Sequence, residues 1–260
     1  MSETIKYGVI GTGAMGQEHI QNINLIENAE VVAVCDTNES SRNQAKSLVR
    51  ESTKFYNDLN ELISKNIADA YIIATPNFTH INVLEQILKT NKHLLIEKPL
   101  CTTTEDCKKF ELLSKDYSKI IWTGMEYRYM PPVKRLIDEV HQNVIGKIKM
   151  LSIREHRFPF LHKVDDWNRF AINTGGTLVE KCCHFFDLMR LVVKSEPVKV
   201  YASGNQNVNH LDEKYDGKTP DIIDNAYVIV DFENGARAML DLCMFAENSE
   251  YQEEIVAVGD

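Results

Sequence analysis

The chain has 260 residues, 43% of them hydrophobic, and a net charge of −9 at neutral pH. This length allows one large domain or two modest ones, and an acidic chain without a basic run is a poor partner for nucleic acid or anionic membranes. No apolar stretch is long enough to span a bilayer, and we expect no signal peptide. Six cysteines without C-x-x-C or zinc-ligand spacing predict reduced thiols in a cytoplasmic protein, and no metal site.

The first predicted strand, Ile5 to Ile10, leads into three glycines at the spacing G-x-G-x-x-G, and a helical stretch follows. Gly11 allows the tight turn, Gly13 lets backbone N–H groups approach a pyrophosphate, and Gly16 lets the helix pack against the strand. The pattern predicts a dinucleotide site, and the alternative is a glycine turn in an ordinary α/β protein. The remaining loop residues of that site are Thr12, Ala14 and Met15.

The second predicted strand, Glu30 to Cys35, ends in Asp36, which lies 20 residues beyond Gly16. A carboxylate at this place would bind the hydroxyls of the adenosine ribose and repel a 2′-phosphate. The sequence therefore predicts NAD as the dinucleotide. NADP is the alternative, because Arg42 is close enough in sequence to reach the same ribose.

Strands and helices continue to alternate over the first half of the chain. Repeated β-α units predict a parallel sheet with right-handed crossovers, in which ligands bind beyond the carboxyl ends of the strands. The predicted strands are 70–74, 93–96 and 120–123, and the predicted helices are 38–50, 79–89 and 104–115. The strand-end segments, where ligand contacts are expected, are Thr75-Pro76-Asn77, Glu97-Lys98-Pro99 and Glu126 to Tyr129.

The second half has longer strands, and Glu233-Asn234-Gly235 is typical of a hairpin. These features predict an antiparallel sheet with helices on one face. The expected architecture is thus a doubly wound parallel sheet in an α/β domain, 1–123, and an α+β domain, 124–260, built on an open, largely antiparallel sheet. Predicted strands lie in 146–158 and at 198–203, 225–232, 236–245 and 255–258, and predicted helices span 133–142 and 176–193.

Two groups of residues are candidates for chemistry. Lys98 lies at a strand end before Pro99, although a surface lysine is an equally good interpretation of position alone. On a continuous helix from Gly176, Glu180 and His184 are an i,i+4 pair on the face opposite the apolar residues. A histidine held by a carboxylate suits a general base, and the alternative is a solvated helix face with a salt bridge.

Together these motifs resemble the Gfo/Idh/MocA family of NAD(P)-dependent oxidoreductases, the group of glucose–fructose oxidoreductase and inositol dehydrogenase. The likeness runs from the first strand to the end of the chain. It implies that Lys98 hydrogen-bonds the reacting oxygen and that His184 is the acid/base, with Glu180 at a position where aspartate is common. The motifs that carry it, in chain order, are 8–16, Asp36, 74–77 with His80, Glu97-Lys98-Pro99, and Gly175-Gly176 followed by Glu180, His184 and Asp187. The cofactor contacts that it implies beyond the glycine loop and Asp36 are Thr75, Pro76, Asn77, His80, Glu97 and Lys98.

The sequence departs from the family at Lys181 and Cys182, where small residues and glycine are common. Lys181 lies at the edge of the predicted active face, where it would contact a substrate hydroxyl or carboxylate, or reach solvent. Family members usually continue well beyond Asp260, so we expect the second domain to lack its last strand and helix and to expose a sheet edge. The expected substrate wall comprises Tyr127, Arg128, Arg157, Trp167, Asn168, Arg169 and Lys181.

The family likeness implies reversible oxidation of a secondary alcohol in a sugar, polyol or inositol. Hydride passes to the nicotinamide while His184 takes the hydroxyl proton and Lys98 stabilises the alkoxide. Two alternatives within the family are an NAD-dependent glycosidase and a non-catalytic cofactor-binding sensor, and a third is an inactive fragment. The likeness also implies a homodimer or homotetramer formed through the open sheet.

Overall fold

In the computed structural model, residues 3–260 fall into two units, each with its own sheet and core. The first unit extends to Gly124 and includes Lys163–Asp165. The second contains Met125–His162 and Asp166–Asp260. Within residues 3–260, no helix combines the length and the hydropathy that a bilayer span requires.

The first unit contains a six-stranded sheet with the order β3-β2-β1-β4-β5-β6, and every neighbouring pair is parallel. From β1 the chain continues to β2 and β3 on one side of β1, and then crosses to β4 on the other side of β1. This reversal is a topological switch point, where sheets of this class bind ligands at the carboxyl ends of the strands. The strands are β1 (Ile5–Ile10), β2 (Ala29–Cys35), β3 (Lys54–Tyr56), β4 (Ala70–Ile73), β5 (His93–Ile96) and β6 (Ile121–Thr123).

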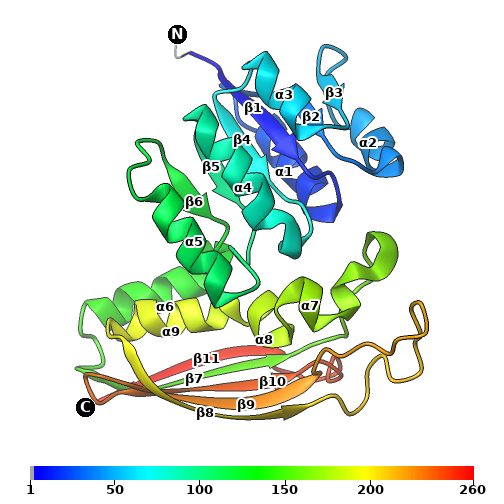
Figure 1. The fold of residues 1–260 in the computed structure, drawn as a ribbon. Helices are drawn as coiled ribbons and strands as arrows, with labels where there is room; N and C mark the ends of the chain where they lie inside the picture. The colour runs from blue at the N-terminus through cyan, green and yellow to red at the C-terminus, as the bar shows by residue number, and fades with distance from the viewer. Residues whose placement is uncertain (1–2) are drawn as a thin grey trace. The chain divides into compact units, whose positions relative to one another are not determined.

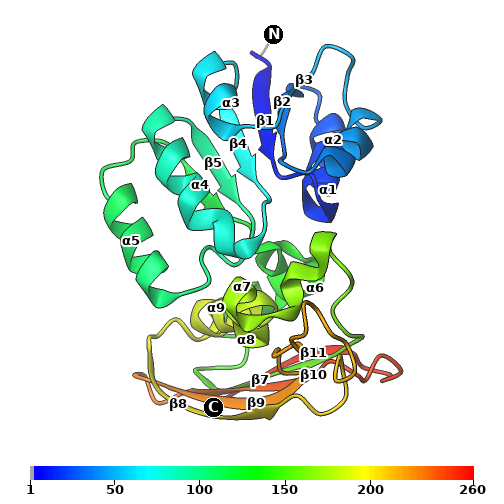
Figure 2. The ribbon, with the colours of Figure 1, turned by 45° about the vertical axis from the view of Figure 1, so that its right-hand side comes forward.

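Helices cover both faces of this sheet (Figures 1 and 2). Ile20 and Ala45 belong to the apolar cluster on the face with α1 and α2, and Leu62 and Leu84 belong to the cluster on the face with α3 and α4. Burial on both faces explains why the strands are nearly continuous apolar runs. The helices are α1 (Ala14–Asn24), α2 (Glu39–Lys46), α3 (Leu59–Lys65), α4 (His80–Ile87) and α5 (Thr104–Ser114), and short 3₁₀ turns η1 (Asn77–Thr79) and η2 (Leu88–Thr90) flank α4.

The helices of this unit differ in whether a side chain caps the N-terminus. Asn38, Asp58 and Thr103 each cap a helix, because the side chain accepts a hydrogen bond from a backbone N–H in the first turn. Helix α1 begins after Gly13 and, like α4, has neither a side-chain cap nor an acidic residue in its first turn. Its N–H groups and its positive dipole end therefore remain available to an anion.

The second unit contains a five-stranded sheet with the order β11-β7-β10-β9-β8. The pair β7–β10 is parallel and the other pairs are antiparallel, which confirms the largely antiparallel sheet expected from the sequence. The strands are β7 (Ile148–His156), β8 (Pro197–Asn205), β9 (Asn225–Phe232), β10 (Arg237–Cys243) and β11 (Glu253–Gly259).

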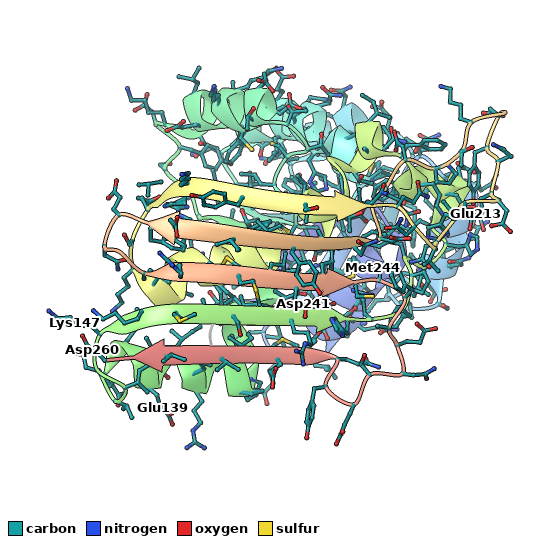
Figure 3. All side chains as sticks on the ribbon, turned by 90° about the horizontal axis from the view of Figure 1, so that it is seen from below. Glu139, Lys147, Glu213, Asp241, Met244 and Asp260 are labelled. Atoms are coloured by element: carbon teal, nitrogen blue, oxygen red, sulfur yellow. The ribbon has the colours of Figure 1, made fainter. Side chains whose placement is uncertain are left out.

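One face of this sheet packs against helices and the other face is open. Leu151, Ile153 and Leu240 point to the helix side, where Phe185 and Met189 complete the buried core. No helix crosses the open face within the described residues (Figure 3). The helical segments are η3 (Glu126–Tyr129), α6 (Pro131–His141), η4 (Val164–Arg169), α7 (Ala171–Thr174), α8 (Thr177–Glu180) and α9 (Cys183–Val193). Lys163 and the first two residues of η4 are assigned to the first unit.

The expected fold class is confirmed in both units, and the strands 5–10, 93–96 and 225–232 have the expected bounds. The sequence analysis missed β3 and α3, because a three-residue strand and a seven-residue helix give too short a periodic signal. The continuous helix expected over 176–193 is wrong. Two helices occupy this segment, with a turn at Lys181 and Cys182.

Candidate functional site

The glycine loop of the first unit joins β1 to α1. Gly11 has a φ of +88°, and a Cβ there would lie 2.5 Å from the Ala74 carbonyl oxygen. A Cβ on Gly16 would lie 2.0 Å from the Gly11 oxygen, so helix and strand approach too closely for any side chain. A Cβ on Gly13 would meet no atom within 4 Å. The loop is thus tightly packed at Gly11 and Gly16 and open at Gly13, beside the uncapped end of α1.

Asp36, at the end of β2, fixes this loop. Its Oδ2 accepts hydrogen bonds from the Thr12 N–H at 2.6 Å and from the Thr12 hydroxyl at 3.0 Å, and its Oδ1 accepts one from the Asn38 N–H at 2.8 Å. The Arg42 guanidinium donates to the Asp36 backbone carbonyl at 2.5 Å. Asp36 is therefore a hydrogen-bond acceptor beside the loop, and the nearby arginine bonds to its backbone carbonyl oxygen rather than to its side chain.

His80 holds two other strand-end loops together. Its Nδ1 lies 2.9 Å from the Pro99 carbonyl oxygen and its Nε2 lies 3.0 Å from that of Thr75. Burial lowers the pKa of this ring, although both carbonyl groups favour the protonated form. Asn77, in the loop after β4, is buried, and its Nδ2 has no hydrogen-bond partner among the described residues. His80 thus braces the loops from within, whereas Asn77 presents a buried amide donor.

Glu97 connects the lysine loop to α1. Its Oε1 lies 2.7 Å from His19 Nε2 and its Oε2 accepts from the Lys98 N–H at 3.2 Å. Burial alone would raise the pKa of Glu97, but the His19 hydrogen bond and the charges of His19 and Lys98 hold it below its usual value. Lys98 is half-buried and the Lys98–Pro99 peptide is cis. These contacts fix the backbone from which Lys98 projects.

These features fit a bound dinucleotide. The open space over Gly13, the uncapped N-terminus of α1 and the unsatisfied Asn77 amide are what an anionic, hydrogen-bonding ligand needs at a switch point. Sequence reasoning missed His19, whose contact with Glu97 joins residues far apart in the chain.

In the second unit, the segment with Glu180 and His184 is folded differently from the expectation. The Thr177 carbonyl accepts from both Lys181 N–H and Cys182 N–H, and α9 then starts at Cys183. Glu180 and His184 are therefore not an i,i+4 pair on one helix. Both are buried, at 3% and 2% exposed, which rules out the solvated helix face.

Three consecutive residues of η3 contact α9 at this point. Glu126 Oε1 lies 3.4 Å from His184 Nε2, and the Tyr127 ring stacks on the His184 ring at a centroid distance of 4.6 Å. Arg128 makes a two-point ion pair with Asp187, with 2.6 Å between Nε and Oδ2. The imidazole is therefore held by a stacked ring on one face and a carboxylate at Nε2.

Lys181 is buried, 7% exposed, and does not reach solvent. Its Nζ lies 2.8 Å from Glu155 Oε1 and donates to the Tyr127 hydroxyl at 2.9 Å, and that hydroxyl donates to Glu253 Oε1 at 2.8 Å. Burial raises the pKa of Glu155, and the Lys181 charge opposes this shift. Burial and the Glu155 charge also raise the pKa of Tyr127. Lys181 is thus an internal ion-pair partner that anchors the tyrosine beneath His184.

The other expected substrate-wall residues are dispersed. Arg157 pairs with Glu155 at 3.5 Å and lies over the Phe158 ring, whereas Asn168 is fully buried and donates to the Leu161 carbonyl. Arg169 is buried against Glu213 at 2.9 Å, and the Trp167 carbonyl accepts from Asn173. The structure thus groups Tyr127, Arg157 and Lys181 in one ion-pair network, and Trp167, Asn168 and Arg169 lie outside it.

Sequence reasoning singled out neither Glu155 nor Glu253, and it noted Glu126 only as the start of a strand-end segment. A signal for Glu155 was present, because it follows Leu151 and Ile153 at a spacing of two and so falls on the core side of β7. A carboxylate at a core position requires a partner. Nothing local in the sequence indicated that His184 would meet Glu126.

Comparison with known proteins matches both units. The Gfo/Idh/MocA models described as "Oxidoreductase family, NAD-binding Rossmann fold" and "Oxidoreductase family, C-terminal alpha/beta domain" match residues 5–125 and 137–256. The chain is 30% identical to myo-inositol 2-dehydrogenase from Thermotoga maritima over 237 residues, which is 91% of this chain and 68% of that protein.

Solved structures share the fold. A probable dehydrogenase from Thermotoga maritima is 28% identical with a TM-score of 0.82, over 98% of this chain and 73% of that one. Myo-inositol dehydrogenase from Lactobacillus casei, in complex with NAD(H) and myo-inositol, has a TM-score of 0.81 over 98% and 72% of the chains, and at 24% identity it supports the fold alone. The chain therefore belongs to the Gfo/Idh/MocA oxidoreductase family, with a Rossmann domain that binds a nicotinamide dinucleotide and a C-terminal α/β domain.

Proposed function

We propose that the protein is an NAD-dependent dehydrogenase that oxidises a secondary alcohol of an uncharged polyol or sugar, with an inositol as the first candidate. The observation that carries this proposal is His184, a buried imidazole held by Tyr127 and Glu126, in a chain whose first unit has an open dinucleotide loop. The 30% identity to a myo-inositol 2-dehydrogenase, of which this chain covers 68%, supports the substrate class.

The first unit would hold the cofactor. Backbone N–H groups at Gly13 to Met15 face the pyrophosphate, Asp36 accepts from the adenosine ribose, and Asn77 donates its unsatisfied amide hydrogen. NAD, when bound, supplies the hydride acceptor for the oxidation. The contacts proposed from the family likeness are Thr12, Gly16, Thr75, Pro76, His80, Glu97 and Lys98, of which His80 acts by bracing the loops.

Three side chains would handle the proton and the charge. His184 takes the hydroxyl proton, and Lys98 donates a hydrogen bond to the oxygen as negative charge develops on it. Glu180, buried four residues before His184, is the carboxylate proposed to favour the protonated ring. In the reverse direction, His184 returns the proton to the carbonyl oxygen.

The ion pairs of the second unit favour an uncharged substrate. Arg128 is paired with Asp187, and Lys181 and Arg157 share Glu155. A cation already paired with a protein carboxylate attracts an added anion less strongly than an unpaired cation does. Hydroxyl groups can still bond to these same side chains, so a polyol suits the site better than a sugar phosphate or a sugar acid.

The test is reduction of NAD and NADP, followed by near-ultraviolet absorbance, with inositols, aldoses, sugar acids and glucose 6-phosphate. We expect NADH with an uncharged polyol or sugar, and a loss of at least about a hundredfold in His184→Ala with NAD binding intact. His141→Gln is the matched control, because this ring bonds to a backbone carbonyl of α9 and takes no part in the proposed chemistry. Near-normal activity in His184→Ala would refute the assignment, and NAD binding without NADH formation would favour the glycosidase or sensor alternatives.

We further propose that the protein forms a homodimer or homotetramer through the open face of the β7–β11 sheet. Tyr201, Ile229, Met239, Ser152 and Val256 are successive register partners and form a row of uncharged side chains across all five strands. Tyr201, Ile229, Met239 and Val256 are exposed. Exposed apolar area of this kind marks interaction surfaces. Light scattering should give a multiple of 29.8 kDa that Ile229→Lys reduces, whereas a wild-type monomer would refute the proposal.

A further inference from the structure

Glu126 is the contact of His184 that sequence reasoning did not assign to the chemistry. Its Oε1 lies 3.4 Å from His184 Nε2, within reach of a proton transfer that is direct or passes through one water molecule. The side chain of His184 is 2% exposed, whereas that of Glu126 is 59% exposed. One carboxylate therefore touches both the buried ring and the solvent.

A buried general base must lose its proton before the next oxidation. Alcohol oxidation leaves one proton on the imidazole, and whichever nitrogen accepts it, the protonated ring carries an N–H at Nε2. Because only 2% of the His184 side chain is exposed, the ring cannot pass this proton directly to bulk water at a useful rate. The step needs an acceptor beside Nε2 that exchanges protons with solvent.

The other charged groups around His184 cannot fill this role. Asp187 is bound by Arg128, Lys181 is bound by Glu155, and Glu180 is 3% exposed. Glu126 is also fixed in place, because the next residue, Tyr127, stacks on the His184 ring and is anchored by Lys181. Glu126 thus lies beside Nε2, is exposed to solvent, and is held in place by its neighbour Tyr127.

We propose that Glu126 is the proton relay of His184. In the oxidation direction the imidazolium N–H bond at Nε2 breaks, the proton passes to the Glu126 carboxylate, and the resulting carboxylic acid loses it to water. In the reduction direction the same atoms carry a proton from water to the ring. The inference rests on the proposed function, since it assigns the next step to the proton that His184 removes.

The experiment compares the wild type with Glu126→Gln, Glu126→Asp and the control Glu139→Gln. Glu139 is a carboxylate on α6 that pairs with Arg135 at the surface. In a single turnover with NAD and the polyol substrate, a pH-indicator dye reports proton release while absorbance reports NADH. We expect the two signals to coincide in the wild type and in Glu139→Gln. In Glu126→Gln, the rate of proton release should be lower than the rate of NADH formation by about tenfold or more.

Two further readouts separate a relay from a structural role. Added acetate should restore steady-state turnover in Glu126→Gln and leave the wild type unchanged, and Glu126→Asp should keep most of the rate. In the protein without cofactor, NMR of labelled histidine should show the His184 titration midpoint at lower pH in Glu126→Gln than in the wild type, because the negative charge 3.4 Å from Nε2 is lost. Proton release in step with NADH in Glu126→Gln would overturn the relay, as would a rate loss that acetate does not restore. A wild type without turnover would count against the proposed function instead, and the titration would still report whether Glu126 acts on His184.

Discussion

Replacing Lys181 with methionine should destabilise the second unit strongly. The ammonium group lies 2.8 Å from Glu155 Oε1 and 2.9 Å from the Tyr127 hydroxyl, and both partners are buried. Removing one member of a buried ion pair typically costs about 3–5 kcal/mol, because the other charge is left without compensation. Arg157, 3.5 Å from the same oxygen, offsets part of this loss, so we expect about 3 kcal/mol for Lys181→Met.

The assay is urea unfolding followed by tryptophan fluorescence. The chain has two tryptophans, and in a Trp122→Phe background Trp167 alone reports on the second unit. Lys134→Met is the matched control, because Lys134 pairs with Asp138 at the surface of α6 and should change the free energy of unfolding by less than about 0.5 kcal/mol.

A double-mutant cycle with Glu155→Gln tests the cause. Each single variant leaves a buried charge without its partner, whereas Lys181→Met with Glu155→Gln removes both charges. The double variant should therefore be more stable than the sum of the single effects predicts, by about 2 kcal/mol or more. A Lys181→Met cost below about 1 kcal/mol, or strictly additive effects, would refute the ion-pair argument.

Three predictions concern the first unit. Asp36→Ala should weaken NAD binding by about tenfold or more in calorimetry and reduce the preference over NADP, because charged hydrogen bonds to ribose are lost, whereas unchanged NAD affinity would contradict this role. Gly16→Ala should lower the free energy of unfolding by at least about 2 kcal/mol, since the added Cβ would lie 2.0 Å from a carbonyl oxygen. Gly13→Ala should lower it by no more than about 1 kcal/mol and still weaken NAD binding. Equal stability losses in the two variants would count against the loop geometry. Burial lowers the pKa of His80 below its unfolded value, so the unfolded chain binds the proton more readily and this contribution to stability is present above about pH 6.5 and lost as the pH falls toward the folded pKa. The free energy of unfolding should thus fall more steeply from pH 7 to 5.5 in the wild type than in His80→Gln, and parallel slopes would show that His80 is not the cause.

The fold was largely predictable because local pattern and tertiary structure agree. The run Ile5–Ile10 forms β1, Gly11 and Gly16 lie where a side chain would not fit, and Asp36 follows β2 and bonds to the glycine loop. Parallel strands buried on both faces give apolar runs, and the residues after them must meet at one edge of the sheet. The apolar runs that stabilise this unit by burial are therefore the same runs that predict its strands from the sequence.

The surroundings of His184 were not predictable in the same way. A helical wheel pairs His184 with Glu180, but the helix is interrupted at Lys181, whose charge is satisfied by Glu155 on β7. The contact with Glu126 joins residues 58 positions apart and forms only when η3 packs against α9. Periodicity describes one element at a time, whereas these contacts depend on which charges the tertiary fold brings together.

The same limit explains the basic residues that were expected to bind substrate. The sequence shows that Arg128, Arg157 and Lys181 are cations, but not that Arg128 pairs with Asp187 or that Arg157 and Lys181 share Glu155. These ion pairs changed the expected ligand from a hydroxylated or anionic one to an uncharged one. The charge of each side chain could be read from the sequence, whereas its ion-pair partner could not.

The central claim is that this chain moves hydride from a polyol carbon to a nicotinamide. The most direct measurement incubates the purified protein with NAD and myo-inositol deuterated at carbon, and follows the dinucleotide by mass spectrometry. The account predicts NADH carrying one deuterium in the wild type and none formed by His184→Ala. Dinucleotide that remains oxidised and unlabelled, from wild-type protein shown to bind both NAD and the polyol, would contradict it.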